Sequence, residues 1–177
     1  QQVFGLLYNV LAFYELYRDE KVESNKKPSS KNILDVWILE RLDQLTEEIT
    51  ENLDKYKLLE PVRAIRDFIN DLSTWYLRRS RERIKENDKD AKETLHFVLK
   101  TLSKLMAPFA PFAADDIWSR LKNESNPRSV HLCEWPSVPF KFFTSRTIIG
   151  KMVKVREVVT LGLEARQKAG IKVRQPL

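Results

Sequence analysis

Cysteine, histidine and glycine are scarce in this 177-residue chain, which has one cysteine, two histidines and four glycines. Cys133 alone cannot form an internal disulfide, and with His96 and His131 it falls short of the four Cys/His ligands of a structural zinc site. So few glycines leave little room for Gly-rich loops that cradle phosphates. We therefore expect no metal site, and most nucleotide-binding enzyme classes are excluded for this chain.

Long hydrophobic runs are also missing. No apolar run approaches the roughly 18 to 20 residues that a membrane span needs, and the start, Gln1–Phe4, lacks the layout of a signal peptide. Hydrophobic residues make up 42% and charged residues 32%, enough to bury a core beneath a charged surface. The sequence thus predicts a soluble, cytoplasmic protein with no membrane partner.

The net charge of +6 is unevenly distributed along the chain. Residues 32–60 carry a net −5, residues 61–85 a net +4 and residues 141–177 a net +7. Two segments therefore hold the basic excess, which favours a polyanion such as RNA as partner. A basic domain whose charge merely keeps it in solution remains an alternative.

Apolar residues at helical spacing predict most of the fold. A helix is expected over about 2–17, another from Asn32 and a third over about 58–85, with Pro61 in its first turn. The second helix has its apolar stripe at Ile38, Leu42, Leu45, Ile49 and Leu53, and the third at Val62, Ile65, Ile69, Leu72 and Tyr76.

The second half of the chain continues the same pattern. The polar stretch 86–90 supplies N-cap residues for a helix carrying Leu95, Val98, Leu99, Leu102, Leu105 and Met106. After Pro108 and Pro111, a shorter helix is expected on Phe112, Ile117, Trp118 and Leu121. Val130–Pro136 is expected to be extended over the bundle, and a last helix over about 145–169 to end at Gly170. The prediction is all-α, with a bundle over 1–136 and a C-terminal basic helix and tail over 137–177, packed on the bundle or continuing it.

In the run Trp75–Arg83, two aromatic residues are followed by four arginines within six residues, 78–83. Arginine forks match phosphate oxygens, and aromatic faces stack on bases. At about 100° per residue, Arg78 and Arg81 fall opposite the apolar stripe, whereas Arg79 and Arg83 continue its line toward the end of the bundle. This pattern favours RNA contact. A solvated helix end whose cations complement the helix dipole is the alternative.

No residues have the spacing of a catalytic site. Lys151–Val155 invites comparison with a lysine-rich ATP loop of certain synthetases, but valines replace both serines of that loop and the segment lies inside a periodic helix. His96 lies on a packed helix, and the adjacent acids Asp115–Asp116 and Glu47–Glu48 point in different directions around theirs. We predict no catalytic residue in this chain.

Five segments resemble isoleucyl-tRNA synthetases in the region after their catalytic core. They are Trp37–Leu42, Asp71–Arg81, Leu102–Phe112, Ser129–Pro136 and Ala165–Leu177. The run Trp75–Arg81 favours the isoleucine branch over its valine and leucine relatives, which remain alternatives. Ile84–Lys85 departs from the family, which commonly has Phe-Trp there. The end at Leu177, in the middle of a family pattern, suggests an excised fragment.

The resemblance implies a helical anticodon-binding domain of the class I synthetase type. Its implied partners are the anticodon stem-loop of isoleucine tRNA and the catalytic domain of the same polypeptide, with the protein a monomer. The implied parent activity is isoleucine–tRNA ligation using ATP and magnesium, with no cofactor in this fragment and no activity of the fragment alone. The RNA-binding role is carried to Trp75, Arg78, Arg79, Arg81, Arg83, Arg166, Lys168, Lys172 and Arg174. A mainly structural bundle that docks on another domain is the alternative.

Overall fold

The computed structural model describes residues 2–19, 26–138, 146–172 and 175. The chain divides into two compact units, Gln1–Pro139 and Phe140–Leu177. The boundary predicted from the sequence lies after residue 136. Helices form both units, and the described ranges contain no strand. The predicted all-α fold is therefore confirmed.

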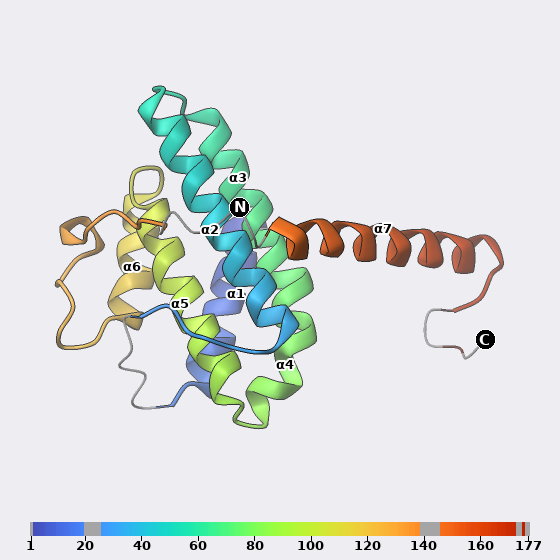
Figure 1. Cartoon of the computed structure of the whole chain (residues 1–177). Coiled ribbons are helices and arrows are strands. Elements are labelled where there is room, and N and C mark those ends of the chain that lie inside the picture. The colour runs from blue at the N-terminus through green and yellow to red at the C-terminus, as the bar shows by residue number, and fades with distance from the viewer. Residues whose placement is uncertain (1, 20–25, 139–145, 173–174, 176–177) are drawn as a thin grey trace. The chain divides into compact units, whose positions relative to one another are not determined.

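The first unit is a bundle of helices, shown with its labels in Figure 1. Helix α5 packs against both α2 and α6, and α1 packs against α3 and α5. The helix α2 lies beside α3, to which a tight turn connects it. In chain order the elements are α1 (Gln2–Tyr17), α2 (Ile33–Asp54), α3 (Leu59–Asp71), the π-helical η1 (Leu72–Leu77), α4 (Arg78–Lys85), α5 (Lys89–Met106), α6 (Pro111–Leu121) and the 3-10 turn η2 (Val130–Leu132).

Local capping chemistry sets several helix ends. The Asn32 side chain accepts a hydrogen bond from the Leu34 N–H at 3.0 Å and starts α2. Asp88 caps α5 in the same way, by accepting from the Ala91 N–H at 3.1 Å. Each cap satisfies a backbone donor that the helix itself leaves unpaired. Asp88 lies within the stretch predicted to supply this cap.

The core confirms the predicted stripe of α5 and four of the five predicted residues of α2, where Leu53 is only half-buried, and it corrects two other stripes. All six predicted α5 residues are buried, as are Ile38, Leu42, Leu45 and Ile49 on α2. Val62 is 46% exposed, because the inner face of α3 runs through Ala64, Ile65, Phe68 and Ile69. Phe112 is 90% exposed. It lies two positions before the buried Ala114, about 200° around α6 and so on its outer side.

The segment after η2 crosses the bundle. Val130–Leu132 forms one 3-10 turn, so the predicted extended conformation begins only at Cys133. The Val130 N–H donates to Asp115 Oδ1 on α6 at 2.9 Å, and Trp135 Nε1 donates to Thr50 Oγ1 on α2 at 2.9 Å. These bonds attach η2 to α6, and they attach the strip that follows η2, residues 133–136, to α2.

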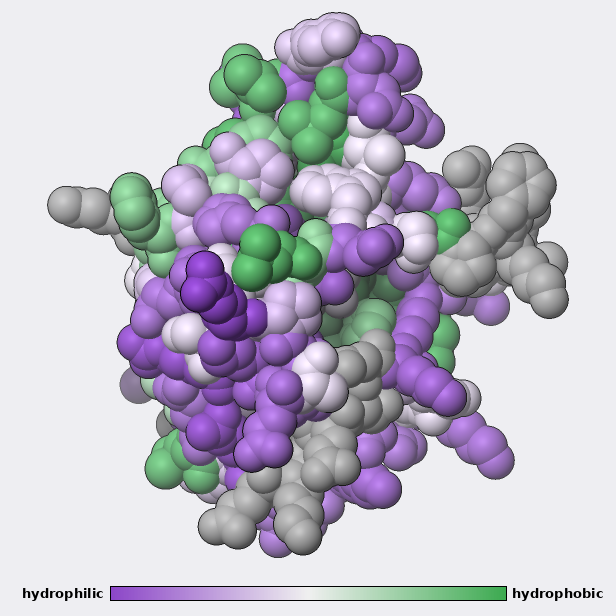
Figure 2. Space-filling model, turned by 90° about the vertical axis from the view of Figure 1, so that its left-hand side faces the viewer, coloured by the Kyte–Doolittle hydropathy of each residue, from purple (hydrophilic) through white to green (hydrophobic). Residues whose placement is uncertain are grey.

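The surface is largely polar. Figure 2 shows a face covered mostly by hydrophilic side chains, with apolar ones in small separate patches. Among the helices that the structure describes, none is both long and apolar enough to cross a membrane.

The second unit contains one long helix, α7 (Arg146–Lys168). It ends at Gly170, whose φ of +68° is the left-handed conformation that glycine adopts without steric cost. The Gly170 N–H donates to the Gln167 carbonyl at 3.1 Å, and the Ile171 N–H donates to the Arg166 carbonyl at 2.9 Å. This pair of bonds is the Schellman motif, which confirms the predicted C-terminal role of Gly170.

Candidate nucleic-acid interface

A π-helical segment interrupts the helix that carries the arginines. The chain is helical from Leu59 to Lys85, as predicted, but η1 separates α3 from α4. A π-helical turn holds one more residue than an α-helical turn, so the positions after η1 rotate by about one residue, or about 100°. Beyond Tyr76 the buried line therefore continues through Ser80 and Ile84.

This rotation changes where two predicted site residues lie. On an uninterrupted α-helix, Arg79 and Arg83 would continue the buried line. In the structure they lie one position before the buried Ser80 and Ile84, and Arg79 is exposed. The side of the helix on which these arginines lie thus depends on the π-helical turn.

Trp75 and Arg79 form a stacked pair on the outer side of η1 and α4. The guanidinium carbon of Arg79 lies 3.8 Å from the centroid of the Trp75 ring. The same guanidinium donates long hydrogen bonds to the carbonyl oxygens of Thr74 at 3.3 Å and Trp75 at 3.4 Å. Stacking on the indole orients the guanidinium while leaving it at the surface.

Arg78 and Arg81 are exposed on α4, as the sequence predicts. Arg81 lies with its guanidinium carbon 5.0 Å from the centroid of the Phe13 ring on α1. Arg78 forms no ion pair or hydrogen bond with any described side chain. Together with Arg79 they give α4 three guanidinium groups at the surface.

Arg83 occupies a different environment. Its guanidinium donates to both carboxylate oxygens of Asp35 on α2, at 3.1 and 2.9 Å, and its Nε donates to Asp88 at 2.9 Å. Only 23% of the Arg83 side chain is exposed, and Asp35 is fully buried. Hydrogen bonds to Asp35 raise the pKa of Arg83 and hold it charged. Its role in RNA binding stays a prediction, but its donors are engaged within the bundle.

Asp35 is the residue that sequence inspection missed. Besides Arg83, it accepts hydrogen bonds from the Tyr76 hydroxyl at 2.9 Å and from Ser30 Oγ at 2.7 Å. Tyr76 is fully buried, which confirms its predicted place in the core, and desolvation there raises its pKa. In the sequence, an aspartate in the first turn of a helix indicates only a favourable interaction with the N-terminus of that helix. Two partners of Asp35, Tyr76 and Arg83, come from η1 and α4, more than 40 residues away.

The remaining predicted residues lie in the second unit. Arg166 Nη2 donates to the backbone oxygens of Lys172, at 2.7 Å, and Gln175, so it links the tail to the end of α7. Lys168 is exposed on α7 and lies about 160° around the helix from Arg166. Lys172 is exposed in the tail, and Arg174 lies outside the described residues.

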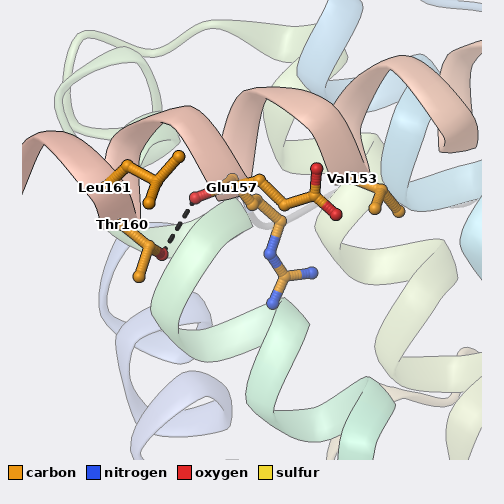
Figure 3. A pocket seen from close by; sticks show the side chains of 5 residues that line it. Val153, Glu157, Thr160 and Leu161 are labelled. Carbon is orange, nitrogen blue, oxygen red and sulfur yellow. Dashed lines mark hydrogen bonds between the residues drawn. The ribbon is translucent and has the colours of Figure 1, made fainter.

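One face of α7 carries side chains of mixed character, with the basic Arg156 beside the acidic Glu157. In Figure 3, Val153, Glu157, Thr160 and Leu161 lie along this helix, and the Thr160 hydroxyl donates to the Arg156 carbonyl at 2.9 Å. At about 100° per residue, Arg156 lies about 140° around α7 from Lys151 and about 160° from Lys154, so the basic residues are not gathered on one stripe of this helix. The end of α7 and the tail belong to the second unit and α4 to the first, so the prediction that they form one RNA-facing surface stays untested.

His96 lies in a buried structural pair, and the lysine-rich run lies within a regular helix. His96 Nδ1 lies 2.9 Å from the Tyr14 hydroxyl in a buried pair, where desolvation lowers its pKa to about 4. Lys151–Val155 is helical within α7. In the part of the chain that the structure describes, no three His, Cys, Asp or Glu side chains are grouped to hold a metal ion.

Comparisons with known proteins agree with a helical surface that carries exposed arginines. The family model for the "Anticodon-binding domain of tRNA ligase" matches residues 35–177. The chain is 38% identical to an isoleucine–tRNA ligase of Streptomyces coelicolor, across 96% of the chain and 17% of that protein. It is 39% and 40% identical to isoleucine–tRNA ligases of Chlamydia muridarum and Clostridium acetobutylicum, across the whole chain and 18% of each relative.

The chain thus spans less than a fifth of the length of these relatives. The match nevertheless begins at the buried Asp35 and includes the arginines of α4. With its helical bundle and its guanidinium groups at the surface, this chain belongs to the family of anticodon-binding domains of tRNA ligases.

Proposed function

We propose that this chain binds the anticodon stem-loop of isoleucine tRNA through α4 and η1. The supporting observation is the outward placement of Arg78, Arg79 and Arg81 on a helix that the Arg83–Asp35 ion pair fixes to α2. Guanidinium forks bind phosphate oxygens bidentately, and the Trp75 ring offers a face on which a base stacks. Lys168 and Lys172 add positive charge from the second unit.

The proposed mechanism is positional. The domain holds the tRNA while a catalytic domain in a longer polypeptide uses ATP and magnesium to join isoleucine to the acceptor end. The protein acts as a monomer in the cytoplasm. Its own residues contribute phosphate and base contacts and no chemical step.

Three exposed arginines predict a measurable salt dependence. Each neutralised phosphate releases condensed counterions, so three contacts give a slope of log K against log salt of about −2 to −3. This electrostatic part is insensitive to sequence. Discrimination among tRNAs must come from base contacts, for which Trp75 and Arg79 are the candidates.

A titration of the chain with isoleucine tRNA tests the proposal, repeated at two salt concentrations and with an unrelated tRNA. The proposal predicts binding that weakens with salt and favours isoleucine tRNA. Absence of binding at low salt would refute it. Equal binding of both tRNAs would reduce the function to unspecific electrostatics.

A domain-docking role is the second candidate function. It is supported by the exposed apolar residues of α7, among them Val155, Val158 and Leu161, because the described residues of their own unit form no second helix to cover them. Crosslinking separates the two candidates. Docking predicts crosslinks from α7 to a catalytic domain, and RNA binding predicts crosslinks from α4 to tRNA.

A further inference from the structure

A cavity with a mostly apolar lining and two lysines lies between α5, α6 and the strip that follows η2, within the first unit. It has a volume of about 280 Å³ and is lined by residues that include Lys100, Lys104, Trp118, Cys133 and Glu134. None of these residues belongs to the proposed RNA surface on α4. The cavity is therefore a separate feature of the bundle.

Two lysines share one aromatic ring in this cavity. Lys100 Nζ lies 5.2 Å and Lys104 Nζ 5.6 Å from the centroid of the Trp118 ring, which is itself only 1% exposed. Lys100 is 7% exposed, and its amine also donates to Asn126 Oδ1. Two like charges are thus held close together in a poorly hydrated place, which favours loss of a proton from the more buried amine.

The groups that face Lys100 determine how readily it becomes neutral. Burial and the charge of Lys104 lower its pKa to about 8. His96, one turn earlier on α5, is neutral above a pH of about 4. Cys133 and Glu134 come from the strip, and Glu134 is the acidic residue of the cavity lining. An amine with a pKa near 8 is about 10% neutral at pH 7, against less than roughly 0.1% for an ordinary lysine.

We propose that Lys100 is a site of covalent N-acylation by small acyl phosphates, with Lys104 binding the phosphate group of the donor. The neutral Nζ attacks the acyl carbon, forming a C–N bond. The bond from that carbon to the leaving oxygen breaks, and its electron pair departs with the phosphate. The nitrogen releases one proton to water, so an amide replaces a charged amine and the repulsion with Lys104 ends.

Acetyl phosphate is a suitable probe, because it is small and carries its charge on the leaving group. The full 177-residue chain is treated at pH 7, and acetylation at each lysine is followed by peptide mass spectrometry. Lys89 lies on the same helix with its side chain 80% exposed, and serves as the internal reference. We expect Lys100 to react at least about tenfold faster than Lys89, with a rate that levels off above pH 8. Equal or slower reaction at Lys100 overturns the proposal.

Substitutions at Lys104 separate charge from packing. Lys104→Met removes the second cation and is expected to slow acetylation of Lys100 roughly fivefold to tenfold, while Lys104→Arg retains the rate. Glu134→Gln removes the repulsion of the anionic donor and is expected to raise the rate. Circular dichroism establishes that each variant is folded. If Met and Arg at position 104 give the same rate, Lys104 does not assist the reaction and the proposal fails.

Discussion

Arg83 on α4 forms a bidentate ion pair with the buried Asp35 on α2, although 48 residues separate them in the sequence. Both carboxylate oxygens take part, and the Tyr76 hydroxyl adds a third bond to the same group. The pair joins the helix that carries the exposed arginines to the helix that begins the matched domain. The orientation of Arg78, Arg79 and Arg81 thus depends on a residue that faces away from the solvent.

Removing Asp35 should destabilise the bundle strongly. Asp35→Ala leaves the Arg83 charge without its main partner, so we expect the free energy of unfolding to fall by about 3–5 kcal/mol. Urea denaturation followed by circular dichroism measures this change. Asp67→Ala is the control, because the exposed pair of Asp67 with Arg66 should contribute less than about 1 kcal/mol. Similar losses in both variants would contradict the structural role of Asp35.

Tryptophan fluorescence should report RNA binding through Trp75. Trp37 and Trp118 are 2% and 1% exposed, whereas Trp75 is half-buried beneath Arg79. Binding of isoleucine tRNA should therefore change the emission of the chain, and Trp75→Phe should abolish the change. Trp135→Phe removes the other accessible indole and should preserve it. If the base stacks on the ring, Trp75→Ala should also weaken binding by about 1–3 kcal/mol.

The stability of the bundle should fall as the pH drops below about 6.5. Burial lowers the pKa of His96 to about 4, below the value of an unfolded histidine, so the unfolded chain binds the additional proton in this window. The loss should approach about 3 kcal/mol near pH 4 and then level off. Comparing urea midpoints from pH 4 to 7 measures it.

The matched variants for this pH effect are His96→Gln and His131→Gln, since His131 is exposed. The first should lose the histidine-dependent part of the pH slope, and the second should retain the slope of the parent chain. A slope that is unchanged in His96→Gln would assign the pH dependence to carboxylates instead.

Two glycines of the second unit should respond to alanine in opposite ways. Neither Gly162 nor Gly170 has an atom within 4 Å of an added Cβ, so packing does not distinguish them. Gly162 lies inside α7, where alanine should stabilise the helix by about 0.5–1 kcal/mol. Gly170 has a positive φ, and alanine there should cost about 1–2 kcal/mol. Amide hydrogen exchange along α7 measures both, and effects of the same sign would contradict the Schellman end.

The regular helices could be predicted because their signals are local. The stripes of α2 and α5, the caps at Asn32 and Asp88 and the end at Gly170 all follow from residues within a few positions of one another. Val62 and Phe112 were predicted as core and are exposed. These two wrong predictions show that apolar residues alone do not determine which face of a short helix packs against another helix.

The arginine cluster could be recognised in the sequence, but the direction in which each arginine points from the helix could not be predicted. A π-helical turn has no distinct signal in residues 72–77, and it moves the buried line onto Ser80 and Ile84. The partner of Arg83 was also beyond local reasoning. A buried aspartate 48 residues away becomes its neighbour only once α2 packs beside η1, which leads into α4.

The central claim, that the outward arginines of α4 bind the anticodon stem-loop, is tested most directly by comparing two charge-matched triple variants. The first replaces Arg78, Arg79 and Arg81 with glutamine. The second replaces the exposed Lys57, Arg63 and Arg66 with glutamine, so both lose three positive charges. Affinity for isoleucine tRNA is measured at two salt concentrations. The first variant should bind at least about tenfold more weakly than the parent chain, and its slope of log K against log salt should be shallower by about two to three. The second variant should keep an affinity and a slope close to those of the parent chain. Equal losses in the two variants would show that only net charge matters and would contradict an RNA site on α4.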